Sequence, residues 1–156
     1  MEIAQLLAPE RILCEPEAVS KKRSLEILSE TLVNNEPGLS AHHVFESLLG
    51  REKLGSTGLG HGVALPHGRS SDISQARLAV IKLARGIDYD APDTEPVDLL
   101  FALIVPEEST EEHLQILAML AEMLADEKFL MQLRQTSDCD ALFRLLTHWK
   151  KASNAA

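Results

Sequence analysis

The sequence predicts an α/β fold: a single domain in which a mixed, mostly parallel β-sheet is flanked by helices on both faces. Helix-type patterns alternate with short apolar runs, and the run over 97–106 is apolar on both faces, as in a central strand covered from both sides. The 156 residues are enough to bury a core, and they contain no repeat or linker. We therefore expect one domain over residues 1–156, with residues 152–156 as a frayed tail.

The first half of the chain predicts two capped helices. A leucine stripe over residues 20–35 indicates a helix that Ser20 caps. Ser40 begins a second helix over 41–55, which Gly55 closes. Apolar runs further along predict strands over 62–66, 76–84 and 97–106, with a short strand piece at Ile87–Tyr89.

The C-terminal third is expected to be helical. Apolar residues recur in helical register over 109–126, where Ser109 and Glu112 match the S-x-x-E capping-box pattern. Two shorter helices are predicted over 127–135 and 139–151.

The composition excludes several classes of protein. A net charge of −9 argues against nucleic acid or an anionic membrane as the main partner. No apolar run approaches the ~20 residues of a membrane-spanning helix, and the N-terminus lacks the pattern of a signal peptide. Cys14 and Cys139 share no motif spacing, so neither a disulfide framework nor a cysteine-based zinc site is indicated. We therefore expect a cytoplasmic protein in a reducing compartment, without membrane insertion.

The stretch Gly55–Arg69 holds five glycines, two histidines and a proline, and predicts a functional loop. A dinucleotide-binding fold requires a strand, then G-x-G-x-x-G, then a helix, whereas these glycines follow a predicted helix and precede a predicted strand. A P-loop is excluded because the stretch has no GK[ST]. A loop whose backbone N–H groups converge on an anion fits the pattern better.

Phosphate is the anion that the surrounding residue types favour. Arg51 and Arg69 flank the stretch with charges suited to phosphate, and hydroxyls can add donors. The predicted residues of this phosphate-binding loop are Ser56, Thr57, Gly58, Gly60 and Gly68.

His67 stands where the predicted strand over 62–66 ends. Pro66 favours an extended backbone for Leu65, and Gly68 is expected to leave one side of the imidazole open. A neutral histidine among N–H donors and arginines is suited to attack a phosphoryl group while its neighbours stabilise the transferring oxygens. The alternative is a glycine-rich turn in which His67 is merely a polar residue.

His113 lies in the first turn of the helix after the strand over 97–106. If that strand is parallel to the strand over 62–66, His67 and His113 meet at the carboxyl edge of the sheet, where ligand sites form. A helix N-terminus disfavours imidazolium, so a neutral His113 could donate to a phosphoryl oxygen; otherwise it is an exposed first-turn residue. A zinc set of these two with His61 lacks the close spacing of zinc enzymes, so no metal or cofactor is predicted.

These residues carry a resemblance to a known family. The segment REKLGSTGLGHGVALPHGR, with EPVDLLFALIVPEESTEEHLQILAMLAEMLAD downstream, resembles the enzyme IIA family of the mannitol/fructose type from the phosphotransferase system. The likeness covers nearly the whole chain and is greatest to the stand-alone, nitrogen-regulatory branch. It rests on a specific motif, G-S-T-G-x-G-x-G-x-A-x-P-H-G.

The resemblance implies both a site and an activity. His67 would be the phosphoryl acceptor, modified on its outer ring nitrogen as tele-phosphohistidine, and His113 and Arg51 would stabilise the phosphoryl group. The donor would be NPr, an HPr-like carrier that receives its phosphate ultimately from phosphoenolpyruvate. The protein would be a phosphotransferase component that regulates partners, such as potassium-transport or metabolic regulators, according to its phosphorylation state.

Two other functions stay open from the sequence. The chain could be the enzyme IIA component that feeds a separate IIB protein of a fructose/mannitol-type sugar transporter. It could also be an interaction module with a vestigial site, although the presence of His67, His113 and Arg51 together argues against loss of the chemistry.

Overall fold

The computed structural model describes residues 2–150, in which six strands form one sheet in the order β1-β5-β6-β3-β2, with β4 also paired to β6. The long central strands β5 (Arg77–Ile87) and β6 (Val97–Pro106) are antiparallel. The pairs β1–β5, β3–β6 and β4–β6 are parallel, and the pair β2–β3 is antiparallel. The predicted mixed, mostly parallel sheet is confirmed; the predicted tail at 152–156 lies outside the described residues.

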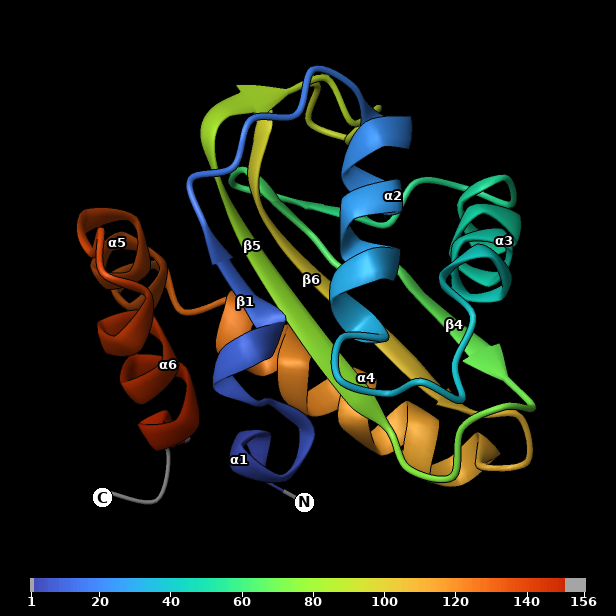
Figure 1. Ribbon diagram of the computed structural model, residues 1–156. Coiled ribbons are helices and arrows are strands. Elements are labelled where there is room, and N and C mark those ends of the chain that lie inside the picture. Colours follow the sequence, from blue (N-terminus) through green and yellow to red (C-terminus); the bar gives the residue numbers. More distant parts are fainter. Residues whose placement is uncertain (1, 151–156) are drawn as a thin grey trace.

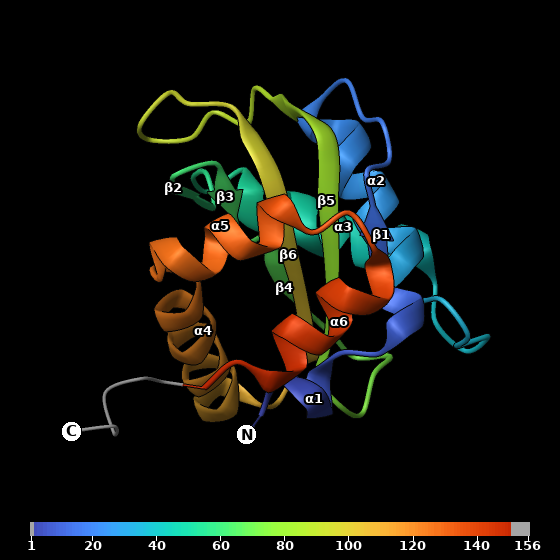
Figure 2. The same cartoon turned by 90° about the vertical axis from the view of Figure 1, so that its left-hand side faces the viewer.

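Helices cover both faces of this sheet (Figures 1 and 2). Helices α2 (Lys21–Leu32) and α3 (Ala41–Glu52) lie over one face. The other face is covered by α4 (Thr110–Leu124), α5 (Glu127–Gln135) and α6 (Cys139–His148). The remaining elements are α1 (Ile3–Leu6), a 3-10 turn η1 (Pro9–Arg11), β1 (Ile12–Cys14), β2 (Gly58–Gly60), β3 (Val63–Ala64) and β4 (His67–Ser70).

Strand β6 shows why both faces need a cover. Successive side chains on a strand point to opposite faces, so a strand that is apolar throughout supplies two cores at once. On β6, Leu99, Phe101, Leu103 and Val105 join the cluster under α4, α5 and α6, whereas Leu100, Ala102 and Ile104 join the cluster under α2 and α3.

The helix ends confirm two of the three predicted caps. The Ser20 hydroxyl accepts the backbone N–H of Arg23, and the Ser40 hydroxyl accepts that of His43. Ser109 makes no such bond, so the predicted capping box is wrong. Its ψ of 63° departs from the extended backbone that an N-cap serine needs, because the chain enters α4 directly from a turn.

Three element boundaries near the glycine stretch differ from the prediction. Helix α3 ends at Glu52, and Gly55 instead closes the following turn through an N–H···O bond to Glu52. The predicted strand over 62–66 is only β3, and His67 begins β4 rather than following a strand. Pro66 lies between the two strands, because it has no N–H to donate to a ladder. Of the piece at Ile87–Tyr89, only Ile87 belongs to a strand.

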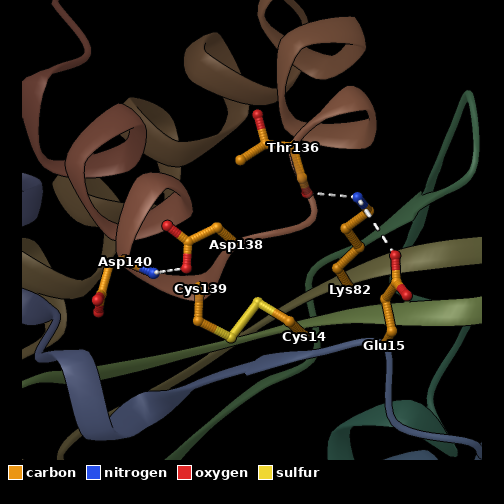
Figure 3. Close-up of a disulfide and its surroundings, with 7 residues drawn as sticks. All are labelled: Cys14, Glu15, Lys82, Thr136, Asp138, Cys139 and Asp140. Carbon is orange, nitrogen blue, oxygen red and sulfur yellow. Dashed lines mark hydrogen bonds and ion pairs between the residues drawn. A yellow bond between two sulfur atoms is a disulfide. The ribbon is translucent and has the colours of Figure 1, made fainter.

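The two cysteines are joined in a disulfide, which corrects the expectation of unpaired thiols (Figure 3). Cys14 ends β1 and Cys139 begins α6, and the fold brings their Cα atoms to 5.7 Å although 125 residues separate them in sequence. Spacing rules detect cysteines that pair within one motif, and this pair connects two distant elements. Within the described part of the chain, no helix is long and apolar enough to cross a membrane.

Candidate functional site

A cavity of about 320 Å³ opens where α3, β4 and the start of α4 meet. Strand β4 runs parallel to β6 with His67 opposite Leu103, so the chain leaving β6 enters α4 beside β4. The rings of His67 and His113 are thereby brought to 5.6 Å between centroids at an angle of 72°. The residues that line the cavity are Ser47, Gly50, Arg51, Leu54, His67, Gly68, Arg69 and His113.

The half-buried His67 ring is held in one tautomer. Its Nδ1 lies 2.8 Å from the carbonyl oxygen of Leu65. A carbonyl can only accept, so Nδ1 carries the hydrogen and Nε2 keeps an unprotonated lone pair. Burial lowers the pKa of His67 below its ordinary value, and the positive charge of Arg51 lowers it further. The ring is therefore a neutral nucleophile at neutral pH.

His113 is buried in the first turn of α4. The Nε–H of Arg69 donates to its Nδ1 at 3.4 Å, which places the ring hydrogen on Nε2. That Nε2 is buried and has no hydrogen-bond partner among the described residues. Burial lowers the pKa of His113, and the neighbouring His67 and Arg69 lower it further. A neutral N–H donor without a partner therefore lies beside His67.

Ser47 joins α3 to β4 and was missed from the sequence. Its hydroxyl donates to the Arg69 carbonyl at 2.7 Å and accepts the Arg69 N–H at 2.9 Å. A Cβ on Gly68 would lie 2.3 Å from the Ser47 oxygen, so Gly68 allows α3 to approach β4 closely. Gly68 thus makes room for Ser47, and it also lines the cavity beside His67. A mid-helix serine carries no sequence signal for this contact.

Arg51, in the last turn of α3, also lines the cavity. Its Nη1 donates to the Gly55 carbonyl at 2.9 Å, so the guanidinium is tied to the turn that follows the helix. The structure therefore brings together five of the residues that the sequence singled out: Arg51, His67, Gly68, Arg69 and His113.

The other members of the predicted phosphate-binding loop lie elsewhere: among the described residues, none from 56 to 60 lines the cavity. The Ser56 hydroxyl donates to the Tyr89 carbonyl, and buried Thr57 bonds to Glu52. A Cβ on Gly58 would come within 2.9 Å of the Ala91 Cβ, and Gly60 has a φ of +91° in the β2–β3 hairpin. These glycines allow close packing and a tight turn.

His61 does not join the other two histidines. Its exposed ring lies 3.7 Å from Glu127 at the start of α5. Within residues 2–150, no group of three or more histidines, cysteines or carboxylates is placed to hold a metal ion.

The arrangement is suited to group transfer onto nitrogen. His67 offers a lone pair, and the two arginines with the His113 N–H surround it with donors for an anionic group. A neutral acceptor flanked by fixed positive charge suits a phosphoryl group, whose three oxygens share close to two negative charges.

Comparison with known proteins agrees with this chemistry. Residues 5–149 match the family "Phosphoenolpyruvate-dependent sugar phosphotransferase system, EIIA 2". The Nitrogen regulatory protein of Pseudomonas aeruginosa is 42% identical over 94% of this chain and 95% of its own length. A fructose-specific EIIA component of Haloferax volcanii is 33% identical over 81% of this chain and 82% of its own length.

A solved structure extends the match to three dimensions. The nitrogen regulatory protein IIA-Ntr of Neisseria meningitidis superposes with a TM-score of 0.87 at 41% identity, covering 93% of this chain and 99% of that one. The match of the family model over residues 5–149, together with these similarities, shows that the chain belongs to the EIIA type-2 family of the phosphoenolpyruvate-dependent phosphotransferase system.

Proposed function

We propose that this protein is a histidine phosphocarrier of the nitrogen-regulatory phosphotransferase system. His67 accepts a phosphoryl group from the phosphorylated HPr-like carrier NPr, which is charged ultimately from phosphoenolpyruvate. The observation that carries the proposal is the bond from His67 Nδ1–H to the Leu65 carbonyl, because it leaves Nε2 as a neutral nucleophile in a cavity lined by arginines. The similarity to nitrogen regulatory proteins supports the regulatory branch.

When the donor phosphohistidine ring carries a hydrogen on its other nitrogen, it leaves as neutral imidazole, and the transfer needs no proton to move during bond exchange. The Nε2 lone pair forms a bond to phosphorus while the P–N bond of the donor phosphohistidine breaks and returns its electron pair to the donor ring. The His67 ring becomes positively charged, and its Nδ1–H bond to the Leu65 carbonyl stabilises that charge. Arg51, Arg69 and the Nε2–H of His113 stabilise the phosphoryl oxygens during transfer.

The phosphorylation state is the regulatory output. A phosphoryl group adds close to two negative charges at pH 7. Leu54, which lines the cavity, is 84% exposed, and Leu114, the residue after His113, is 66% exposed. Both offer apolar surface on which a partner can dock. New charge on His67 repels a partner that binds apolar surface and recruits one that carries basic residues. Regulators of potassium transport and of metabolism are the proposed partners.

The proposal is tested by intact-mass analysis after incubation with phosphoenolpyruvate, enzyme I-Ntr and NPr. We expect one acid-labile phosphoryl addition that depends on NPr. Folded protein that gains no mass from this cascade, or from a phosphorylated HPr in place of NPr, would exclude the phosphocarrier function.

The second candidate is an enzyme IIA component that passes phosphate to a separate IIB protein of a sugar transporter. The similarity to a fructose-specific EIIA component favours it. Phosphorylated protein mixed with a purified fructose-type IIB distinguishes the two functions: fast transfer supports the sugar pathway, and retained phosphate supports the regulatory one.

His113→Ala is expected to slow phosphoryl acceptance by about a hundredfold without abolishing it, because one preorganised donor is lost while the nucleophile remains. Rapid-quench mixing with phosphorylated NPr measures the rate. His148→Ala, an exposed histidine at the end of α6, is the matched control and should transfer at the wild-type rate. Equal rates of phosphoryl acceptance for the two variants would show that His113 does not contribute to the transfer.

The lowered pKa values of His67 and His113 predict that the protein still accepts a phosphoryl group in mild acid. A ring whose pKa lies below the ordinary value of about 6.5 is still mostly neutral at that pH, so the nucleophile is not lost there. NMR titration of the ring C–H signals should give midpoints below 6.5 for both histidines. A midpoint above 6.5 for His67 would contradict its burial beside Arg51.

A further inference from the structure

Glu52, the last residue of α3, is an unusual residue to bury. Its side chain is only 2% exposed, and its carboxylate makes four hydrogen-bond or ion-pair contacts with the residues around it. It accepts from the Thr57 N–H at 3.1 Å, from the Thr57 hydroxyl and from the Tyr89 hydroxyl at 3.0 Å, and it pairs with the Lys21 ammonium at 2.8 Å. Lys21 also lies 4.6 Å from the centroid of the Tyr89 ring. A buried carboxylate is tolerated only with such full pairing.

These bonds close the turn between α3 and β2 into a ring. The Glu52 carboxylate reaches across to Thr57, which fixes both ends of residues 53–56. Within this ring, the Gly55 carbonyl oxygen accepts a hydrogen bond from the Arg51 Nη1 at 2.9 Å. Lys21 at the start of α2 and Tyr89 after β5 attach the ring to the body of the fold.

We propose that Glu52 is a positioning residue for phosphoryl transfer: it holds the 53–57 turn so that Arg51 is fixed beside His67. The inference rests on the proposed function. Glu52 does not line the cavity, whereas Arg51, its neighbour in sequence, does, so Arg51 and not Glu52 contacts a group bound there. A fixed cation stabilises transition-state charge without the cost of reorienting during the reaction.

Helix α3 does not need this network for its attachment. Val44 and Leu48 are buried in the core under the helix, and Ser47 bonds to β4. What the carboxylate adds is order in the turn that follows Arg51. The same network uses the glycine-rich stretch: Thr57 supplies two donors, and Gly58 lets the chain pass close to Ala91.

A double-mutant cycle tests the inference. Glu52→Gln keeps the shape of the side chain and removes its charge, and we expect rapid-quench phosphoryl acceptance to slow by about tenfold to a hundredfold. In an Arg51→Ala background the same substitution should change the rate by less than about twofold, because the residue it positions is gone. Glu46→Gln, an exposed glutamate on the same helix, is the matched control and should leave the rate unchanged.

Two results would overturn the inference. Glu52→Gln that transfers at the wild-type rate shows that the turn does not position Arg51. An equal slowing in the presence and absence of Arg51 shows that Glu52 acts by another route, such as overall stability. If Glu52→Gln does not fold, Tyr89→Phe removes one donor to the carboxylate, and a loss of about threefold that disappears in the Arg51→Ala background is expected.

A second measurement keeps this inference separate from the proposed function. The NMR signal of the Arg51 side-chain Nε–H and the hydrogen exchange of the 53–57 amides are recorded in wild type and Glu52→Gln. We expect faster exchange and a shifted Arg51 signal in the variant, whether or not the protein accepts phosphate. Unchanged signals would exclude the positioning role, whereas a wild type that takes no phosphoryl group would refute only the function.

Discussion

His67→Ala is expected to lose all phosphoryl acceptance from phosphorylated NPr. The variant lacks the Nε2 lone pair that the Leu65 carbonyl leaves free as a nucleophile, whereas the arginines and His113 remain in place. Removing the group that forms the covalent bond has a larger effect than removing any donor around it. Intact-mass analysis after incubation with the donor should show a single unmodified species.

The His113→Ala variant, incubated under the same conditions, is the control for His67→Ala. This control variant should still gain one phosphoryl group on long incubation, since its nucleophile is intact. Because His67 is only half-buried, alanine there should leave the far-UV circular dichroism unchanged. Full modification of His67→Ala would place the acceptor on another residue, and tandem mass spectrometry would then locate it.

The main architecture could be predicted because its signals are local and repeated. Strand β6 is apolar at nearly every position, which indicates a central strand with two covered faces. Ser20 and Ser40 cap their helices through bonds only three residues away, so a short sequence window contains the whole interaction. The predicted parallel pairing of the strand over 62–66 with the strand over 97–106 is confirmed by β3 and β6. His67 meets His113 from the start of β4, a strand that the sequence analysis did not predict.

What the sequence could not predict depends on contacts between distant elements. The acceptor that fixes the His67 tautomer is the carbonyl of Leu65, and nothing in its side chain marks that role. The glycine stretch suggested a phosphate cradle because glycines serve both anion binding and close packing. Only the position of Ala91, beside Gly58, shows that packing is the reason at that residue.

Breaking the Cys14–Cys139 disulfide is expected to lower the free energy of unfolding by about 4–5 kcal/mol, because the bond closes a loop across most of the chain in the unfolded state. The bond joins the end of β1 to the start of α6, and α6 packs Leu142 and Leu146 into the core. Urea unfolding in the presence and absence of a thiol reductant, followed by circular dichroism, measures the change.

The control for this prediction is the Cys14→Ser, Cys139→Ser double variant, whose unfolding midpoint should match that of the reduced wild type and should not respond to reductant. Neither cysteine lines the cavity, so phosphoryl acceptance by the folded variant should equal that of wild type.

Cys139 begins α6, where the helix N-terminus stabilises a thiolate, so it is the sulfur that we expect to leave when a reductant thiolate attacks Cys14. Wild-type protein whose stability is the same with and without reductant, although free thiols are detected, would show that the bond contributes nothing. If the thiols stay undetectable, the fold shields the disulfide, and the serine variant alone measures its contribution.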